Sequence, residues 1–251
     1  MRRIDSLRTQ LHALDGKDYG AYQSLLGCYT YGPFNLYFDQ IPKDPYAPPG
    51  TGVYRVRIPR ENSGFPETCF SSQIRQTAFR DFLARLFLEA CARLCPGRRG
   101  TGSSGIITIA EPGQEILDRS SIRVDEEFLE ARFFLGLPAS GRNIDADTVQ
   151  LMLFQELPHI VESALFAANT NLDALETHIR AYEDAEHLRD QLPRLGLAAF
   201  VADGSVLPRR SSIDPRPLRD TAVFPFTSPE CLRVMVELPH AGTITGMGIP
   251  V

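Results

Sequence analysis

The segment from Gly97 to Gly105 combines residue types that can bind an anion. Its glycines tolerate positive φ, which can turn backbone N–H groups toward a ligand. Arg98 and Arg99 stand beside them, and a guanidinium group donates to phosphate oxygens in a fork. The alternative of equal weight is a flexible basic connection, because Gly/Ser clusters usually mark turns. On the first interpretation the segment predicts an anion-binding loop made of Gly100, Thr101, Gly102, Ser103, Ser104 and Gly105.

This segment does not match the ATP-binding P-loop. That loop ends in Gly-Lys-Ser/Thr and leads into a helix, whereas an apolar, β-branched run follows here.

Arginine dominates the basic residues, since Lys17 and Lys43 are the only lysines among 26 Lys and Arg residues. The net charge of −5 argues against an indiscriminate polyanion binder, so the placement of the arginines matters more than their number. Coding bias would also explain the composition. Arg75, Arg98 and Arg99 have no acidic neighbour in sequence, and further arginines lie in loops of small residues. The arginines predicted to bind nucleic-acid phosphates are Arg98, Arg99, Arg142, Arg209 and Arg210.

A carboxylate enzyme is the competing hypothesis, because paired acids in different environments can divide acid and base roles. The candidates are Asp125, Glu126 and Glu127, and an acidic helix around Asp184. Such clusters are more often solvated surfaces. The five histidines and five cysteines form no metal-binding spacing, so we expect no metal.

The pattern of apolar residues predicts an α+β fold, in which a mixed sheet packs against several long helices. Helical periodicity covers 2–14, 71–94, 147–167 and 171–192, with Ser71 or Ser72 and Asp145 or Asp147 as N-caps. Pro158 is expected to kink or split the third of these long helices. Strands are expected at 35–39, 53–58, 106–109, 120–124, 131–137, 197–202, 206–207, 232–238 and 243–247.

The sequence has no apolar run long enough to span a membrane and no signal-peptide core at its start. We therefore expect a soluble, cytoplasmic protein without a membrane partner.

Several runs together resemble the family of predicted ABC-class ATPases. They are Gly100-Thr-Gly-Ser-Ser-Gly105, Pro112-Gly-Gln-Glu-Ile-Leu-Asp-Arg119, Phe200-Val-Ala-Asp-Gly-Ser-Val-Leu-Pro-Arg-Arg210 and Thr245-Gly-Met-Gly-Ile-Pro250. The resemblance implies an N-terminal domain over 1–228 and the first strands of an ABC-type core over 229–251. In the family the last run leads into the Walker A loop, so the chain is expected to be truncated before it. A lysine stands in the family at the position of Ser103, which weakens the anion-loop interpretation.

What the resemblance implies about function is a non-catalytic module of a nucleotide-binding protein. Walker A, Walker B and the signature motif are absent, so this chain is not expected to hydrolyse ATP alone. ATP and magnesium are implied only for the full-length P-loop NTPase. The partner implied for this chain is its own ABC core, and a homodimer is a further possibility that the resemblance raises. Binding of single-stranded RNA is also implied. A purely structural domain that positions the core is the remaining alternative.

Overall fold

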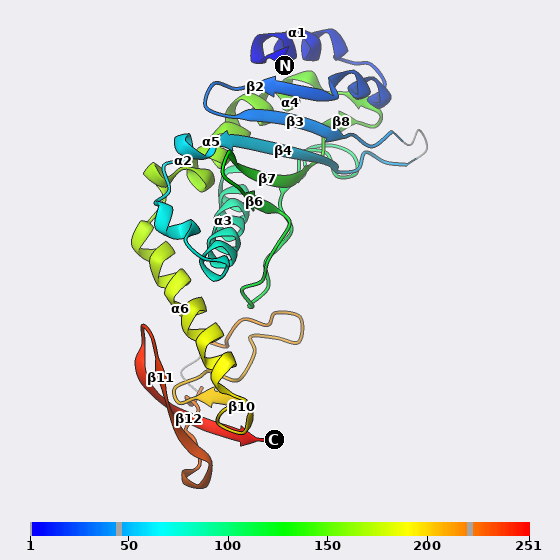
Figure 1. The fold of residues 1–251 in the computed structure, drawn as a ribbon. Coiled ribbons are helices and arrows are strands. Elements are labelled where there is room, and N and C mark those ends of the chain that lie inside the picture. Colours follow the sequence, from blue (N-terminus) through cyan, green and yellow to red (C-terminus); the bar gives the residue numbers. More distant parts are fainter. Residues whose placement is uncertain (1, 44–46, 220–222) are drawn as a thin grey trace.

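The computed structural model of the protein describes residues 2–43, 47–219 and 223–251. Figure 1 shows a body built on one large sheet, a long helix α6 that leads away from it, and a small sheet at the far end of that helix. The predicted α+β class is confirmed, with a mixed sheet and long helices.

The large sheet is antiparallel except at one edge, where β1 and β2 run parallel. β6 and β5 both pair with β7, one after the other along the same edge. In the described part of the chain its order is β1 (Arg2–Arg3), β2 (Gly27–Thr30), β3 (Asn35–Gln40), β4 (Gly52–Pro59), β7 (Phe128–Leu135) and β5 (Ile107–Thr108), with β6 (Ile122–Val124) beside β7.

Strict alternation along β4 separates the two faces of this sheet. Tyr54, Val56 and Ile58 are fully buried, whereas Arg55 and Arg57 between them are half-buried on the opposite face. Because successive side chains of a strand point to opposite sides, one face of the sheet forms the core and the other stays open. The predicted strand with a basic outer surface is therefore confirmed.

The helices cover only the core face. α3 (Gln73–Leu94) packs against α5 (Leu157–Leu165) and touches β5 and β6, and Figure 1 shows α4 (Ala146–Leu151) and α5 behind the strands. α1 (Ile4–Leu14) lies at the β1–β2 edge and α2 (Arg60–Ser63) follows β4. The core contains Tyr22, Tyr54, Phe79, Phe87 and Phe133, all almost inaccessible.

Local signals define the helix ends as expected. The Ser72 hydroxyl accepts the Arg75 N–H at 3.1 Å, and the Asp145 carboxylate accepts the Thr148 N–H at 3.0 Å. Pro158 does not split its helical region: it lies in the first turn of α5, directly after a π-helical turn at Met152–Glu156. Proline is common in the first turn of an α-helix, and a π-helical turn directly precedes that turn here.

The C-terminal part is a three-stranded sheet in the order β10 (Leu197–Ala202), β12 (Gly242–Pro250) and β11 (Arg233–Leu238). The terminal strands therefore pair with each other and with β10. The expected edge strand at 206–207 is wrong: these residues form no strand, and β10 pairs with β12. A separate hairpin joins β8 (Ala139–Ser140) to β9 (Asn143–Ile144).

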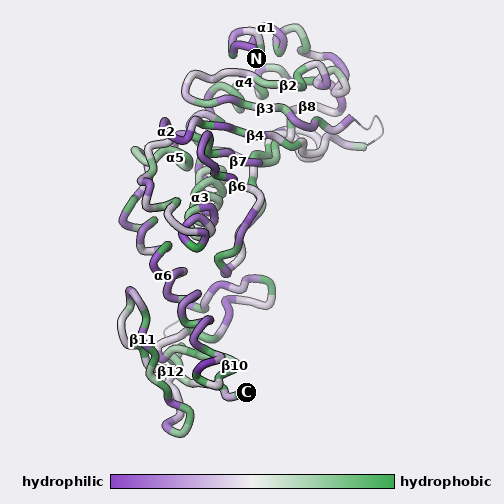
Figure 2. The backbone as a smooth tube through the Cα atoms, viewed as in Figure 1, coloured by the Kyte–Doolittle hydropathy of each residue, from purple (hydrophilic) through white to green (hydrophobic). Residues whose placement is uncertain are grey.

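Helix α6 (Leu172–Gln191) connects the two parts, and most of its residues are hydrophilic (Figure 2). The Asp184 carboxylate accepts the N–H groups of His240 and Ala241 at 2.9 Å each, which fixes the β11–β12 turn on the helix. At the other side Arg75 of α3 donates to Glu176 and Glu183 of α6. Among the described residues, no helix is both long and apolar enough to cross a membrane.

Candidate functional site

The backbone of the glycine loop is already hydrogen-bonded within the protein. The Thr101 N–H donates to the Ala139 carbonyl at 2.9 Å, the Ser103 N–H to the Pro49 carbonyl at 2.7 Å, and the Gly105 N–H to the Gly136 carbonyl at 2.8 Å. These amides join three separate segments, 47–50, 100–105 and 136–141. The glycines do have positive φ as expected, but the hydrogen bonds point to a structural role and not to an anion-binding one.

Close packing at this junction gives a first prediction. A Cβ on Gly136 would lie 1.8 Å from the Ser103 carbonyl oxygen, so Gly136→Ala must displace backbone. We expect it to lower the free energy of unfolding by about 1–3 kcal/mol, measured by urea denaturation. Gly50→Ala is the control, because its Cβ would meet only the Pro42 ring at 3.6 Å. Equal effects of the two substitutions would contradict the packing described.

The arginines beside this loop are not all free. Arg99 donates through both Nη atoms to the Glu156 carboxylate, at 2.6 and 2.7 Å, so the expectation that it has no acidic partner is wrong. The same correction applies to Arg75, which pairs with Glu176 and Glu183. Arg142 pairs with Asp18 at 3.2 Å. Arg98 is exposed and makes no ion pair with any described residue.

Arg209 and Arg210 belong to another part of the molecule. They lie in the segment after β10, which Figure 1 shows beside the lower end of α6, whereas Arg98, Arg99 and Arg142 lie on adjoining loops of the N-terminal body. Arg210 is 3.8 Å from Asp214, and Arg209 is exposed. The structure therefore divides the expected set into two groups, and its role in binding stays a prediction.

Two acidic residues of the competing hypothesis, Asp125 and Asp184, have structural roles. The Asp125 carboxylate accepts the N–H groups of Glu127 and Phe128, which stabilises the turn between β6 and β7. Asp184 fixes the β11–β12 turn, as described above. In the part of the chain that the structure describes, no group of His, Cys, Asp and Glu is arranged to hold a metal ion.

A denser cluster of arginines lies on the open face of the large sheet. We define the open face as the side chains of β3, β4, β6 and β7 that point away from the helices. Cross-strand register places Arg55 opposite Tyr37 and Arg132, and Arg57 opposite Asn35 and Glu130. The open face consists of Asn35, Tyr37, Asp39, Val53, Arg55, Arg57, Arg123, Phe128, Glu130, Arg132 and Phe134.

Glu130 organises this face. Its side chain is inaccessible to solvent and accepts hydrogen bonds from Arg55 Nη1 at 3.0 Å, Arg57 Nε at 2.5 Å and Arg132 Nε at 2.8 Å. Burial alone would raise the pKa of Glu130, but hydrogen bonds from Arg57 and Arg132 outweigh it, so the pKa lies below its usual value. The carboxylate is therefore ionised and holds three guanidinium groups in fixed positions.

Two of these guanidinium groups keep their outer edges available. Arg57 and Arg132 use only Nε on Glu130, and no described residue accepts a hydrogen bond from their Nη atoms. Their side chains are 30% and 42% exposed. An anchored guanidinium with unused Nη donors can bind a phosphate oxygen pair at a low cost in side-chain entropy.

Guanidinium and aromatic groups alternate across the open face. The Arg55 and Arg57 guanidinium carbons lie 4.8 and 5.4 Å from the centre of the Tyr37 ring. The Arg57 guanidinium carbon also lies 4.0 Å from the Phe128 ring centre, and that of Arg123 lies 5.5 Å from the same ring centre. We call this run the ladder: Arg55, Tyr37, Arg57, Phe128 and Arg123.

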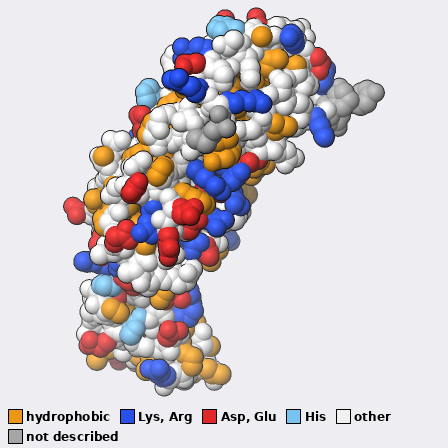
Figure 3. Space-filling model, turned by 45° about the horizontal axis from the view of Figure 1, so that its top comes forward, with side chains coloured by type: hydrophobic (Ala, Val, Ile, Leu, Met, Phe, Trp, Pro, Cys, Tyr) orange, Lys and Arg blue, Asp and Glu red, His pale blue; other side chains and the backbone are white. Residues whose placement is uncertain are grey.

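A cleft of about 570 Å³ continues from the open face past the edge formed by β6. Arg123 and Arg132 belong to both the open face and this cleft. Arg80 and Arg119 bring the number of guanidinium groups in the cleft lining to four, compared with two carboxylates, those of Asp118 and Asp125. On the face that Figure 3 displays, Lys and Arg side chains gather in the middle of the molecule beside a group of Asp and Glu side chains.

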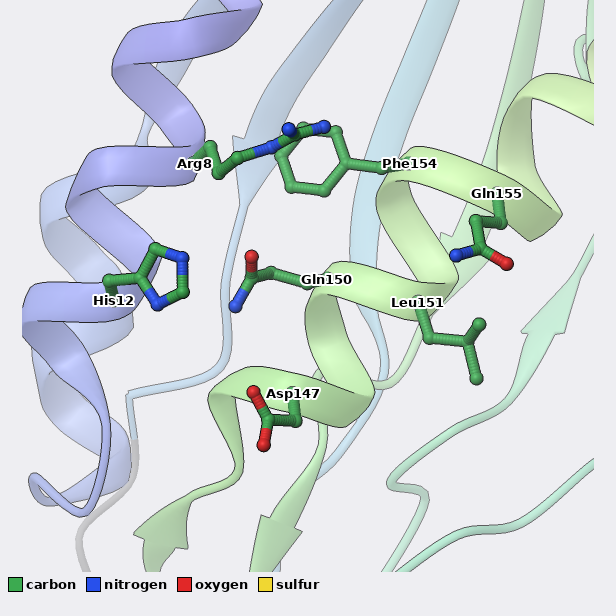
Figure 4. Close-up of a pocket in the computed structure, with 7 residues that line it drawn as sticks. All are labelled: Arg8, His12, Asp147, Gln150, Leu151, Phe154 and Gln155. Carbon is green, nitrogen blue, oxygen red and sulfur yellow. The ribbon is translucent and has the colours of Figure 1, made fainter.

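A second cleft, of about 540 Å³, lies between α1 and α4. Figure 4 shows the Arg8 guanidinium lying flat over the Phe154 ring, and their separation is 4.7 Å. His12, Gln150 and Asp147 line the rest of it. It has one guanidinium group, compared with four in the cleft at β6.

Comparisons with known proteins identify the two parts of the chain. Residues 4–168 match the model of the N-terminal region of ATPases of the ABC class, and residues 171–251 match the P-loop domain model of ABC ATPases. Among curated proteins, none matches this sequence. The junction of the two matches falls just before α6, whereas the expected domain boundary at 228/229 stays a prediction.

Proposed function

Because this chain belongs to the ABC-class ATPases, we propose that it serves such an ATPase as a non-catalytic module that binds single-stranded nucleic acid, with RNA as the expected ligand. The observation that carries the proposal is the pair Arg57 and Arg132, both anchored through Nε by the buried Glu130, with no described residue accepting a hydrogen bond from their Nη atoms. Phosphate contacts of this kind supply most of the sequence-independent affinity for nucleic acids.

ATP and magnesium are proposed for the assembled ATPase and not for these residues. The 251 residues contain no Gly-x-x-x-x-Gly-Lys-Ser/Thr run, and the only lysines, Lys17 and Lys43, each precede an aspartate. The sequence therefore lacks the lysine and hydroxyl that hold nucleotide phosphates in a P-loop, and we assign no step of hydrolysis to these residues.

The salt dependence of binding tests the proposal. We expect the affinity for a 20-nucleotide single-stranded RNA, measured by fluorescence anisotropy, to fall as salt rises, with a log–log slope of about −0.7 for each phosphate contacted. Arg57→Gln with Arg132→Gln should reduce the steepness of that slope by about 1.4, since two contacts are lost. A response independent of salt in the unmodified chain would reject nucleic-acid binding and favour a purely structural domain.

The loop arginines provide a matched comparison. Arg98→Gln with Arg209→Gln removes the same charge from two exposed arginines outside the open face. If these loops bind the RNA, as the sequence predicts, Arg98→Gln with Arg209→Gln should change the slope as much as Arg57→Gln with Arg132→Gln does. If only the Arg57 and Arg132 substitutions change the slope, the RNA-binding interface is the open face.

A further inference from the structure

We propose that the cleft at β6 binds a phosphate monoester, the doubly charged group that ends a phosphorylated nucleic-acid strand and that small phosphorylated molecules also carry. The cleft has a volume of about 570 Å³ and is lined by four guanidinium groups and two carboxylates, which leaves two positive charges in excess. The chain as a whole has a net charge of −5. A phosphate monoester carries about −1.5 to −2 charges at neutral pH. The charge of the cleft lining therefore matches a monoester better than the single charge of an internal phosphodiester.

The four guanidinium groups come from the helix side and from the sheet side of the cleft. Arg80 of α3 and Arg119 of the segment before β6 have side chains that are 14% and 19% exposed. Arg123 of β6 and Arg132 of β7 are 55% and 42% exposed. Because α3 packs against β6, all four line one space. A monoester offers three terminal oxygens, so it can accept hydrogen bonds from both sides at once.

Two buried carboxylates hold cleft arginines in place without neutralising them. Asp81 accepts a hydrogen bond from Arg119 Nε at 3.1 Å and also pairs with Arg85. Glu130 accepts from Arg132 Nε at 2.8 Å and is shared with two further arginines of the open face. No described residue accepts a hydrogen bond from Arg119 Nη1 or from either Nη atom of Arg132. These anchored donors can bind phosphate oxygens at a low cost in side-chain entropy.

The other two arginines pair with the carboxylates of the cleft lining itself. Arg80 lies 2.9 Å from Asp118, and Arg123 lies 3.4 Å from Asp125. Ion pairs with solvent-accessible carboxylates contribute little, so a phosphate can replace these partners readily. The exposed Ser120 hydroxyl, which has no hydrogen-bond partner among the described residues, adds a donor to the lining.

The end of the RNA strand provides the first test. The single-stranded RNA of the salt titration is compared with and without a 5′-phosphate, by fluorescence anisotropy of a label at its 3′ end. We expect the 5′-phosphate to tighten binding about 10-fold, and Arg80→Gln with Arg123→Gln to remove this advantage. Neither arginine forms an ion pair with the buried Asp81 or Glu130, so the clusters that anchor the other guanidinium groups remain.

A charge-matched variant is the control. Arg98→Gln with Arg209→Gln removes two exposed arginines that do not line the cleft, so it should keep the advantage of the 5′-phosphate. Equal loss in the two double variants would overturn the proposal. If circular dichroism shows that Arg80→Gln with Arg123→Gln does not fold, Arg123→Gln alone takes its place, because that side chain is 55% exposed. It should reduce the advantage about threefold.

Inorganic phosphate tests the same site without RNA. In isothermal titration calorimetry at constant ionic strength, we expect the unmodified chain to bind phosphate. Arg80→Gln with Arg123→Gln should weaken that binding about 10-fold, whereas Arg98→Gln with Arg209→Gln should leave it unchanged. Phosphate binding that needs Arg80 and Arg123, together with equal affinity for the two RNA strands, would identify a free small phosphate as the ligand.

The outcomes separate this inference from the proposed function. An advantage for the 5′-phosphate that needs Arg80 and Arg123 identifies the end of a strand as the ligand, and in that case the inference rests on the proposed function and deepens it. If RNA binds in a salt-dependent manner but neither the 5′-phosphate nor inorganic phosphate depends on these arginines, the cleft is not a phosphate site and the proposed function stands. If no RNA binds while inorganic phosphate does so through Arg80 and Arg123, the proposed function fails and the site remains.

Discussion

Phe133→Ala is expected to lower the free energy of unfolding by about 3–5 kcal/mol, as measured by urea denaturation. Phe133 points from β7 into the core, where it is 1% exposed. Its ring centre lies 5.9 Å from that of Tyr54 on β4 and 5.5 Å from that of Phe87 on α3. Truncation would leave a cavity between the sheet and its main helix.

The neighbouring residue is the control for this prediction. Phe134 is the same residue type on the same strand, but it points to the open face and is 37% exposed. Phe134→Ala should therefore cost less than about 1 kcal/mol, because little apolar surface returns to water. Comparable losses for the two substitutions would mean that β7 has no open face, and would remove the basis of the proposed interface.

Asp81→Asn is expected to lower the free energy of unfolding by about 3 kcal/mol near pH 5, since it leaves two half-buried guanidinium groups without their buried counter-charge. The Asp81 carboxylate is fully buried on α3. It pairs with Arg85 at 2.6 Å, Arg119 at 3.1 Å and His178 of α6 at 3.3 Å. Asp118→Asn is the control: that exposed carboxylate pairs with Arg80, and its loss should cost less than about 1 kcal/mol.

The pH dependence of that difference follows from the pKa of Asp81. Burial would raise the pKa, but hydrogen bonds from His178, Arg85 and Arg119 outweigh it and place the pKa below the usual 3.8. The stability that the ionised carboxylate contributes is therefore present above about pH 3.8 and lost as pH falls through the lower folded value. Urea denaturation at pH 5 and pH 2.5 should show the Asp81→Asn difference shrinking at the lower pH. A difference that grew would contradict the lowered pKa.

The elements of this fold could be predicted because their signals are local. The alternation of Val53 to Ile58 and the cap at Ser72 each depend on residues a few positions apart, and both are present as expected. Strand pairing is not local in this sense. The sequence predicted a strand at 206–207, and this strand does not form. The partner of β10 is β12, and their pairing could not be predicted from local signals.

The arrangement of the arginines was predicted less well for the same reason. Arg99 and its partner Glu156 are 57 positions apart, and Arg75 is 101 positions from Glu176. The glycine loop has the composition of an anion site, yet its amides bind carbonyls from two other segments. On the open face, the alternation of apolar and basic residues along β4 predicted its basic outer side. Its register with Tyr37 and Phe128 required three strands to be aligned.

Helix α6 makes mechanical communication between the two matched regions direct. Its 20 residues span about 30 Å as a single helix. Glu183 accepts from Arg75 at 2.8 Å and lies 3.0 Å from the His240 ring, so one carboxylate contacts both the sheet-bearing body and the terminal hairpin. A shift of α3 at Arg75 would therefore reach the terminal hairpin through the single side chain of Glu183.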